Sequence, residues 1–246
     1  MNTVQTHESL HAATEIGNVS PTTNATRARL GAASLVVAGI LFVLYPAIRP
    51  FSDEGLSSAT SDAAILRAAT AFASPEWVLA HMLGMLGFIL IGLGMLGLYF
   101  TLRETRSERL AFRALVVGWL GIGLTLPYYG GEAFGLHAIG QEALRQHSAA
   151  LVSLANVVRG GPQEVMFGVA LLLIAVSAIM VAVAIWKSGV LPRWSGVPFA
   201  LAFALYIPQF FGNQPIRVAH GLLVAIGCLW IAASMWRKGN EQALPR

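Results

Sequence analysis

Six long apolar stretches joined by short polar loops constrain this chain more than any other feature of its sequence. A helix needs about 20 mostly apolar residues to cross the hydrocarbon core of a bilayer. Six segments are close to that length: 30–48, 77–102, 114–136, 165–186, 194–211 and 218–236. We therefore expect an all-α, polytopic six-helix transmembrane bundle over residues 29–238, with the lipid bilayer as its main partner.

The composition supports a membrane protein. Hydrophobic residues make up 56% of the chain and charged residues only 11%, whereas a soluble domain carries about 25% charged residues. The net charge is +4, but the bases are scattered along the loops instead of forming a patch with interleaved aromatics, so we expect no nucleic-acid partner. Cys228 is the only cysteine, which excludes an intrachain disulfide.

The two ends of the chain differ from the apolar segments. Residues 1–28 are rich in Thr, Ser, Asn and Ala and show no hydrophobic period, which predicts a disordered tail. We expect no cleaved signal peptide, because the first apolar run lies too far from the N-terminus and lacks a small-residue cleavage pattern. Residues 239–246 are predicted to form a second, short tail.

The distribution of basic residues predicts the orientation in the membrane. Alternate loops divide the Lys and Arg residues eleven to five, and the side that receives fewer holds Arg49, Arg67, Arg145, Arg159 and Arg217. Basic residues near helix ends are retained in the cytoplasm. Both termini are therefore expected inside, in an N-in/C-in arrangement. Within the long outer loops, 61–72 and 139–158 show helical apolar periods and are expected to form amphipathic helices that cap the bundle.

Several helix starts and one irregular point are visible. Pro75, Pro162 and Pro215 each stand at the first position of an outward-starting segment, where proline is favoured. In the third segment, Pro127 and the glycine pair that follows it predict a kinked or opened helix. Irregular backbone at that depth is tolerated mainly where protein or a wet cavity surrounds it.

The predicted orientation gathers polar side chains on the outer side: His81, Glu132, His137, Glu164, Arg217 and His220. We take as candidate ligand-binding residues His81, Tyr128, Tyr129, Glu132, Gln209, Arg217 and His220, with Glu132 as the candidate catalytic group if there is one. Purely structural roles for the two acids stay open. Glu164 suits the first turn of a helix, where it interacts with the dipole, and Glu132 suits a solvated position among the headgroups.

Two roles are open for His81 and His220. They are either hydrogen-bonding groups between helices or, at similar depth, ligands of one metal ion with Glu132 or of one haem. No ligand spacing within a single segment favours the second role, and we expect no cofactor. The centres of all six segments lack ionisable groups, which disfavours an ion-coupled transporter or proton pump.

Three functions remain in view. The first is binding of a small or amphipathic molecule, or of a partner protein, at an outward-facing polar pocket. The second is an intramembrane enzyme that acts on a lipophilic substrate, with Glu132 as acid or base and the two histidines as metal ligands or proton carriers. The third is a membrane assembly scaffold without a pocket. The sequence favours binding over an enzyme and does not name the ligand.

Two short segments carry a resemblance. The run Ile185-Trp186-Lys187-Ser188-Gly189-Val190-Leu191-Pro192-Arg193-Trp194, and Leu96-Gly97-Leu98-Tyr99 followed by Arg103, resemble inner loops of bacterial six-helix membrane proteins of unknown function. The resemblance implies a multi-pass protein of the bacterial plasma (inner) membrane with six helices. It implies no activity and no site residues.

Overall fold

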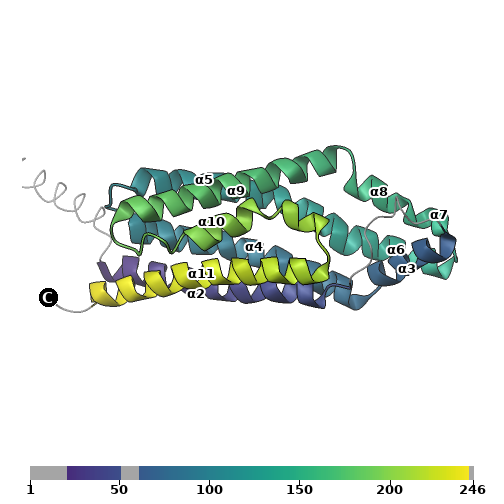
Figure 1. The fold of residues 1–246 in the computed structure, drawn as a ribbon, viewed down its shortest axis with the longest axis horizontal. Helices are drawn as coiled ribbons and strands as arrows, with labels where there is room; N and C mark the ends of the chain where they lie inside the picture. Colours follow the sequence, from purple (N-terminus) through teal and green to yellow (C-terminus); the bar gives the residue numbers. More distant parts are fainter. Residues whose placement is uncertain (1–20, 51–60, 244–246) are drawn as a thin grey trace, which may run out of the picture.

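The computed structural model describes residues 21–50 and 61–243, in which every regular element is a helix. Five helical stretches are long and apolar enough to cross a membrane, and they run alongside one another (Figure 1). They belong to α2 (Pro21–Ile48), α4 (Pro75–Leu102), the continuous stretch Glu108–Arg145, α9 (Pro162–Ser188) and α11 (Gln214–Ala243). The prediction of an all-helical fold with several helices long enough to cross a membrane is confirmed.

The stretch 194–211, expected as a single helix, is broken. It forms α10 (Val197–Ala204), a turn, and the 3-10 helix η2 (Pro208–Phe211). Pro208 explains the break, because proline has no backbone N–H to bond the carbonyl of Ala204, four residues earlier, and its ring clashes with that carbonyl. The described chain therefore contains five long helices and one interrupted apolar stretch, in place of six uninterrupted helices.

The helix ends also differ from the predicted bounds. The first helix begins at Pro21, inside the predicted tail, and residues 1–20 of that tail lie outside the described residues. The last helix runs to Ala243, so most of the predicted C-terminal tail is helical, and 244–246 lie outside the described part of the chain.

Small residues bring the helices of the bundle close together. α2 packs against both α4 and α11, and α5 (Glu108–Gly130) packs against α9. A Cβ added to Gly97 would lie 2.5 Å from the Cα of Gly31, so these two backbones touch. Without a hydrophobic driving force between helices in lipid, such close packing is what holds them together.

A second, smaller apolar core lies beyond one end of the bundle. We call the four helices that form it the cap: α3 (Asp62–Phe72), α6 (Leu136–Arg145), α7 (Ala149–Val152) and α8 (Leu154–Arg159). Phe72, Leu136 and Val152 are buried there against Trp77 of α4. α11 ends at the other end of the molecule (Figure 1). The predicted segment 61–72 is thus the single helix α3, whereas 139–158 is divided among α6, α7 and α8, and α3 packs against α6 and α7.

A π-helical turn connects the bundle to the cap. α5 continues past Pro127 to Gly130, and residues Gly131–Gly135 then form the π-helix η1, which leads directly into α6. The backbone N–H of Leu136 bonds to the carbonyl of Gly131, five residues earlier. This is the irregular point predicted near the glycine pair, and such turns occur frequently at functional sites.

Candidate functional site

A cleft of about 740 Å³ lies where the cap meets the bundle. It is lined by the end of α2, the start of α4, the π-helical turn, α8, the start of α9, η2 and the start of α11. Its polar and charged lining side chains are Tyr45, Arg49, His81, Tyr128, Tyr129, Glu132, Asn156, Arg159, Glu164 and Arg217. Pockets for small molecules in proteins have volumes of about 300–1,000 Å³.

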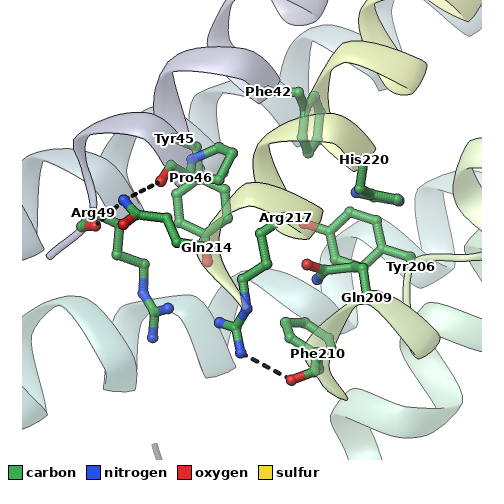
Figure 2. Close-up of a pocket in the computed structure, with 10 residues that line it drawn as sticks. All are labelled: Phe42, Tyr45, Pro46, Arg49, Tyr206, Gln209, Phe210, Gln214, Arg217 and His220. Atoms are coloured by element: carbon green, nitrogen blue, oxygen red, sulfur yellow. Dashed lines mark hydrogen bonds between the residues drawn. The ribbon is translucent and has the colours of Figure 1, made fainter. Parts of the chain in front are cut away.

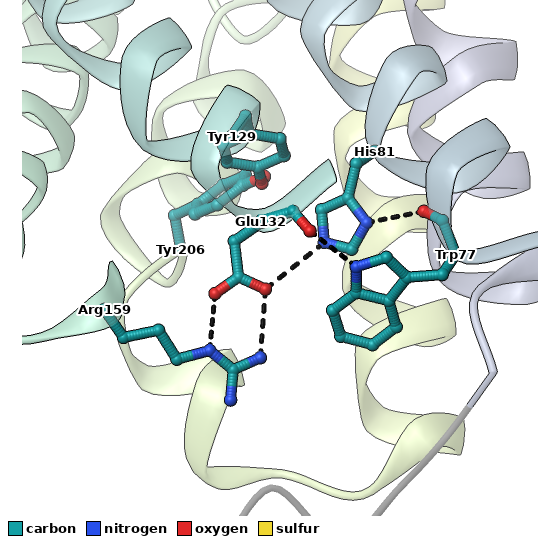
Figure 3. Close-up of polar contacts among 6 residues, drawn as sticks. All are labelled: Trp77, His81, Tyr129, Glu132, Arg159 and Tyr206. Carbon is teal, nitrogen blue, oxygen red and sulfur yellow. Dashed lines mark hydrogen bonds and ion pairs between the residues drawn. The ribbon is translucent and has the colours of Figure 1, made fainter. Parts of the chain in front are cut away.

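Glu132 is held by an arginine from the cap (Figure 3). Arg159 Nε donates to Oε1 at 2.6 Å and Nη2 donates to Oε2 at 2.9 Å. This bidentate geometry matches the planar guanidinium fork to the carboxylate and is among the stronger hydrogen-bonded arrangements in proteins. Glu132 lies in the π-helical turn just before α6, and Arg159 ends α8. The pair therefore joins the two ends of the stretch that contains α6, α7 and α8.

Trp77 and His81, one helical turn apart on α4, pack beside this pair. Trp77 Nε1 donates to the main-chain oxygen of Glu132 at 2.6 Å. His81 Nδ1 lies 2.7 Å from the carbonyl oxygen of Trp77 and must donate to it, because a carbonyl only accepts. His81 Nε2 then faces Glu132 Oε2 at 3.7 Å, longer than a hydrogen bond. The indole therefore holds the backbone of Glu132, and the imidazole packs beside its carboxylate (Figure 3).

A smaller cavity of about 20 Å³, large enough for about one water molecule, adjoins the cleft (Figure 2). It shares Tyr45, Arg49, Phe210 and Arg217 with the cleft. It also contains Gln209, Gln214, Tyr206 and His220. Tyr206 bonds to Tyr129 through their hydroxyls at 2.7 Å. His220 Nε2 lies 2.8 Å from the carbonyl oxygen of Ala202.

The charges buried in the protein are concentrated at the cleft. Three Arg, Lys, Asp or Glu residues are buried within the described part of the chain, and all three line the cleft: Arg49, Glu132 and Arg217. Burying an ionised group is costly unless partners or a ligand compensate for the lost water. Ionisable residues in such a position within a membrane protein are by default candidates for function.

One wall of the cleft is aromatic. Tyr128 and Phe167 stack with ring centroids 4.0 Å apart and planes 4° apart. The ring centroid of Phe210 lies 5.9 Å from that of Phe167. Phe211, at the end of η2, is 90% exposed. The cleft therefore combines arginines from α2 and α11 with aromatic side chains from α9 and η2, and the two groups meet where the Arg217 guanidinium lies 5.8 Å from the centroid of the Phe210 ring.

The structure brings the predicted candidates together around these two cavities. His81, Tyr128, Tyr129, Glu132 and Arg217 line the cleft, whereas Gln209 and His220 line the smaller cavity. Glu132 is buried and not a solvated acid at headgroup level. Glu164 stands in the first turn of α9, as expected, and is exposed at the cleft. His137, further along the cap, has its Nδ1 2.9 Å from the carbonyl oxygen of Phe72.

Several residues that line the cleft were not among the candidate ligand-binding residues, and two of them are the arginines Arg49 and Arg159. Both counted only as orientation signals, and Trp77, which bonds the Glu132 backbone, was not a candidate either. The guanidinium of Arg49 lies 4.5 Å from the ring centroid of Trp77. The one available signal was that Arg49 directly follows an apolar segment, while Arg159 closes an amphipathic one.

The shared metal site of His81, His220 and Glu132 does not form in this structure. The two histidines line different cavities, and His220 Nε2 is engaged by Ala202. Within residues 21–50 and 61–243, no three His, Cys, Asp or Glu side chains are grouped so that they could hold a metal ion.

Comparisons of the chain with protein-family models, with curated proteins and with solved structures found no match.

Proposed function

We propose that this chain is an integral membrane protein that binds a small amphipathic molecule in the cleft between the bundle and the cap. The observation that carries the proposal is the coincidence of the buried charges with a cleft of ligand size. Arg49, Glu132 and Arg217 line about 740 Å³ of space together with an aromatic wall. A cavity that combines apolar surface with a few convergent polar groups is the usual form of a small-molecule site.

The proposed orientation has six crossings, both termini in the cytoplasm and the cleft on the outer side of a bacterial plasma membrane. The excess of basic residues on the loops at the far end from the cap supports it. The interrupted stretch supports the sixth crossing. Trp194 packs on Trp186 with ring centroids 4.6 Å apart, while Phe210, later in the same stretch, lines the cleft.

Single cysteines test this orientation. Cys228→Ser removes the native thiol, after which Arg145→Cys in the cap and Arg109→Cys at the start of α5 provide one exposed site each. We expect a membrane-impermeant maleimide to label Arg145→Cys in intact cells and Arg109→Cys only after permeabilisation. The reverse pattern would overturn the orientation.

The alternative function, an intramembrane enzyme with Glu132 as acid or base, has less support than ligand binding. Both carboxylate oxygens of Glu132 are occupied by the Arg159 guanidinium, so the group proposed as acid or base is already engaged. The scaffold reading does not account for the cleft or for the concentration of buried charge around it.

Photo-crosslinking tests the binding function. The protein, in phosphatidylcholine nanodiscs, is exposed to diazirine-bearing hexadecyl probes with either an alcohol or a phosphate head group, and crosslinked peptides are mapped by mass spectrometry. Asn156→Trp fills the cleft from α8, and Val157→Trp, one position along the same helix and outside the cleft lining, is the matched control.

We expect at least one probe to label the cleft peptides in the wild type and in Val157→Trp, and much less in Asn156→Trp. If neither head group gives labelling of the cleft, or if both tryptophan variants behave alike, the binding proposal is wrong.

A further inference from the structure

The lining of the cleft carries more basic than acidic side chains. Three arginines line it, Arg49, Arg159 and Arg217, against the two carboxylates Glu132 and Glu164. Glu132 is bonded by Arg159, and Glu164 is exposed at the start of α9. The interior of the cleft is therefore richer in positive than in negative groups.

Arg49 and Arg217 are the two buried arginines of this lining. Their side chains come from the end of α2 and the start of α11, and they are 7% and 8% exposed. Figure 2 shows both guanidinium groups extending in the same direction from these neighbouring helices. Arg217 is positioned by bonds from Nε to the Gly212 carbonyl at 3.2 Å and from Nη2 to the Phe210 carbonyl at 2.9 Å.

Such a pair suits an anionic group. A guanidinium offers a planar fork of donors that matches a phosphate or carboxylate in two-point contact. Hydrogen bonds between ionised groups are roughly twice as strong as those between neutral groups. In a nearly buried position the attraction is also less screened by salt than it is at a surface.

The aromatic part of the lining, which begins beside Arg217 at Phe210, suits a hydrocarbon chain. Phe167 is stacked on Tyr128, Phe210 packs beside it, and Phe211 is 90% exposed where η2 ends. An exposed aromatic side chain next to an apolar wall provides surface that a bound chain would cover. The arginines and the aromatic residues thus impose one orientation on an amphiphile.

We propose, on the basis of the binding function above, that the ligand is an anionic amphiphile. Its phosphate or carboxylate head group contacts Arg49 and Arg217, and its chain lies along Phe167, Phe210 and Phe211.

The test compares head groups on one chain. Wild-type protein in phosphatidylcholine nanodiscs is titrated with the diazirine-bearing hexadecyl phosphate and, separately, with the matching hexadecyl alcohol. We expect the phosphate probe to label the peptides of α9 and η2 at a concentration about tenfold lower than the alcohol probe, the factor expected from one charge-assisted hydrogen bond. Unlabelled hexadecyl phosphate should compete, and inorganic phosphate at the same concentration should not.

Variants assign the effect to the arginines. Arg49→Gln and Arg217→Gln should each lose most of the preference for the phosphate probe, whereas Arg49→Lys should keep part of it. Arg109→Gln, an exposed arginine at the other end of α5, is the matched control and should behave as wild type. If a glutamine variant fails to fold, judged by gel filtration, the comparison of head groups on the wild type still decides.

The outcomes separate the two proposals. Equal labelling by the alcohol and the phosphate would overturn the anionic ligand and leave the binding function standing. Competition by inorganic phosphate as effective as that by hexadecyl phosphate would show a site for a free anion and overturn the amphiphile. Absence of cleft labelling by either probe would overturn both.

Discussion

Removing the ion pair between the π-helical turn and the cap should destabilise the protein well beyond the loss of a surface contact. The perturbation is a double-mutant cycle of Glu132→Gln, Arg159→Gln and the combined variant. Each single replacement leaves one charged group at the cleft without the partner it bonds at 2.6 and 2.9 Å. The combined variant removes both charges.

The magnitude follows from the burial of the pair. The Glu132 side chain is 9% exposed and that of Arg159 is 18% exposed. Breaking a fully buried pair by removing one partner costs about 3–5 kcal/mol, whereas a surface pair contributes about 0–1 kcal/mol. Because Arg159 keeps some contact with water, we expect about 2–3 kcal/mol for each single variant and a coupling free energy of about 2 kcal/mol.

Unfolding in mixed micelles measures these free energies. The purified protein is titrated with SDS and followed by tryptophan fluorescence, and the free energy of unfolding is compared across the cycle. The pair Glu142–Arg145 on α6 provides the control, since its side chains are 44% and 69% exposed. Its own cycle should show no coupling beyond the error of the measurement.

A coupling free energy for Glu132 and Arg159 as small as that of the control pair would refute the reasoning. It would mean that the two side chains are solvated and that the cap is not held to the bundle by this contact.

Two further perturbations use the same assay. Trp77→Phe removes the indole donor that lies 2.6 Å from the Glu132 carbonyl and replaces a fully buried indole by a smaller ring. The lost hydrogen bond and the cavity together should lower the free energy of unfolding by about 2–4 kcal/mol. An unchanged value would contradict both the hydrogen bond and the burial of the ring. Gly97→Ala places a Cβ 2.5 Å from the Gly31 backbone and should lower the free energy of unfolding by about 1–3 kcal/mol. The control is Gly123→Ala, whose added Cβ would have nothing within 4 Å and should not lower it. Equal effects of the two variants would contradict the close contact between α2 and α4.

The helix starts were predictable because their signals are local. Ser74 Oγ accepts from the N–H of Trp77 at 3.2 Å and Pro75 opens α4, as an N-cap followed by proline predicts. Pro162 opens α9 in the same way. The signal for the break at Pro208 is equally local, but the prediction of a single helix rested on the apolar character of the stretch and did not consider this proline.

The contacts of the site were not predictable from periodicity. The sequence predicted that Glu132 and His81 would lie on the same side, but nothing local pairs Glu132 with Arg159, 27 positions away. That pairing depends on how α6, α7 and α8 fold back through the cap, and apolar spacing fixes which face of each helix is buried without fixing the path of the chain. The same holds for Tyr129 and Tyr206, whose hydroxyls meet across 77 positions.

The π-helical turn at Gly131–Gly135 also determines how α6, which follows it directly, is rotated about its own axis. Each residue of an α-helix advances the chain by about 100° around its axis, so deletion of one residue from this turn would rotate α6 by roughly that angle. Gly140 now faces α3, where an added Cβ would lie 2.7 Å from the backbone nitrogen of Ala73. Rotated, α6 would present a different face to α3, and the cap would have to dock elsewhere or detach. One residue in this turn thus decides which way the cap faces.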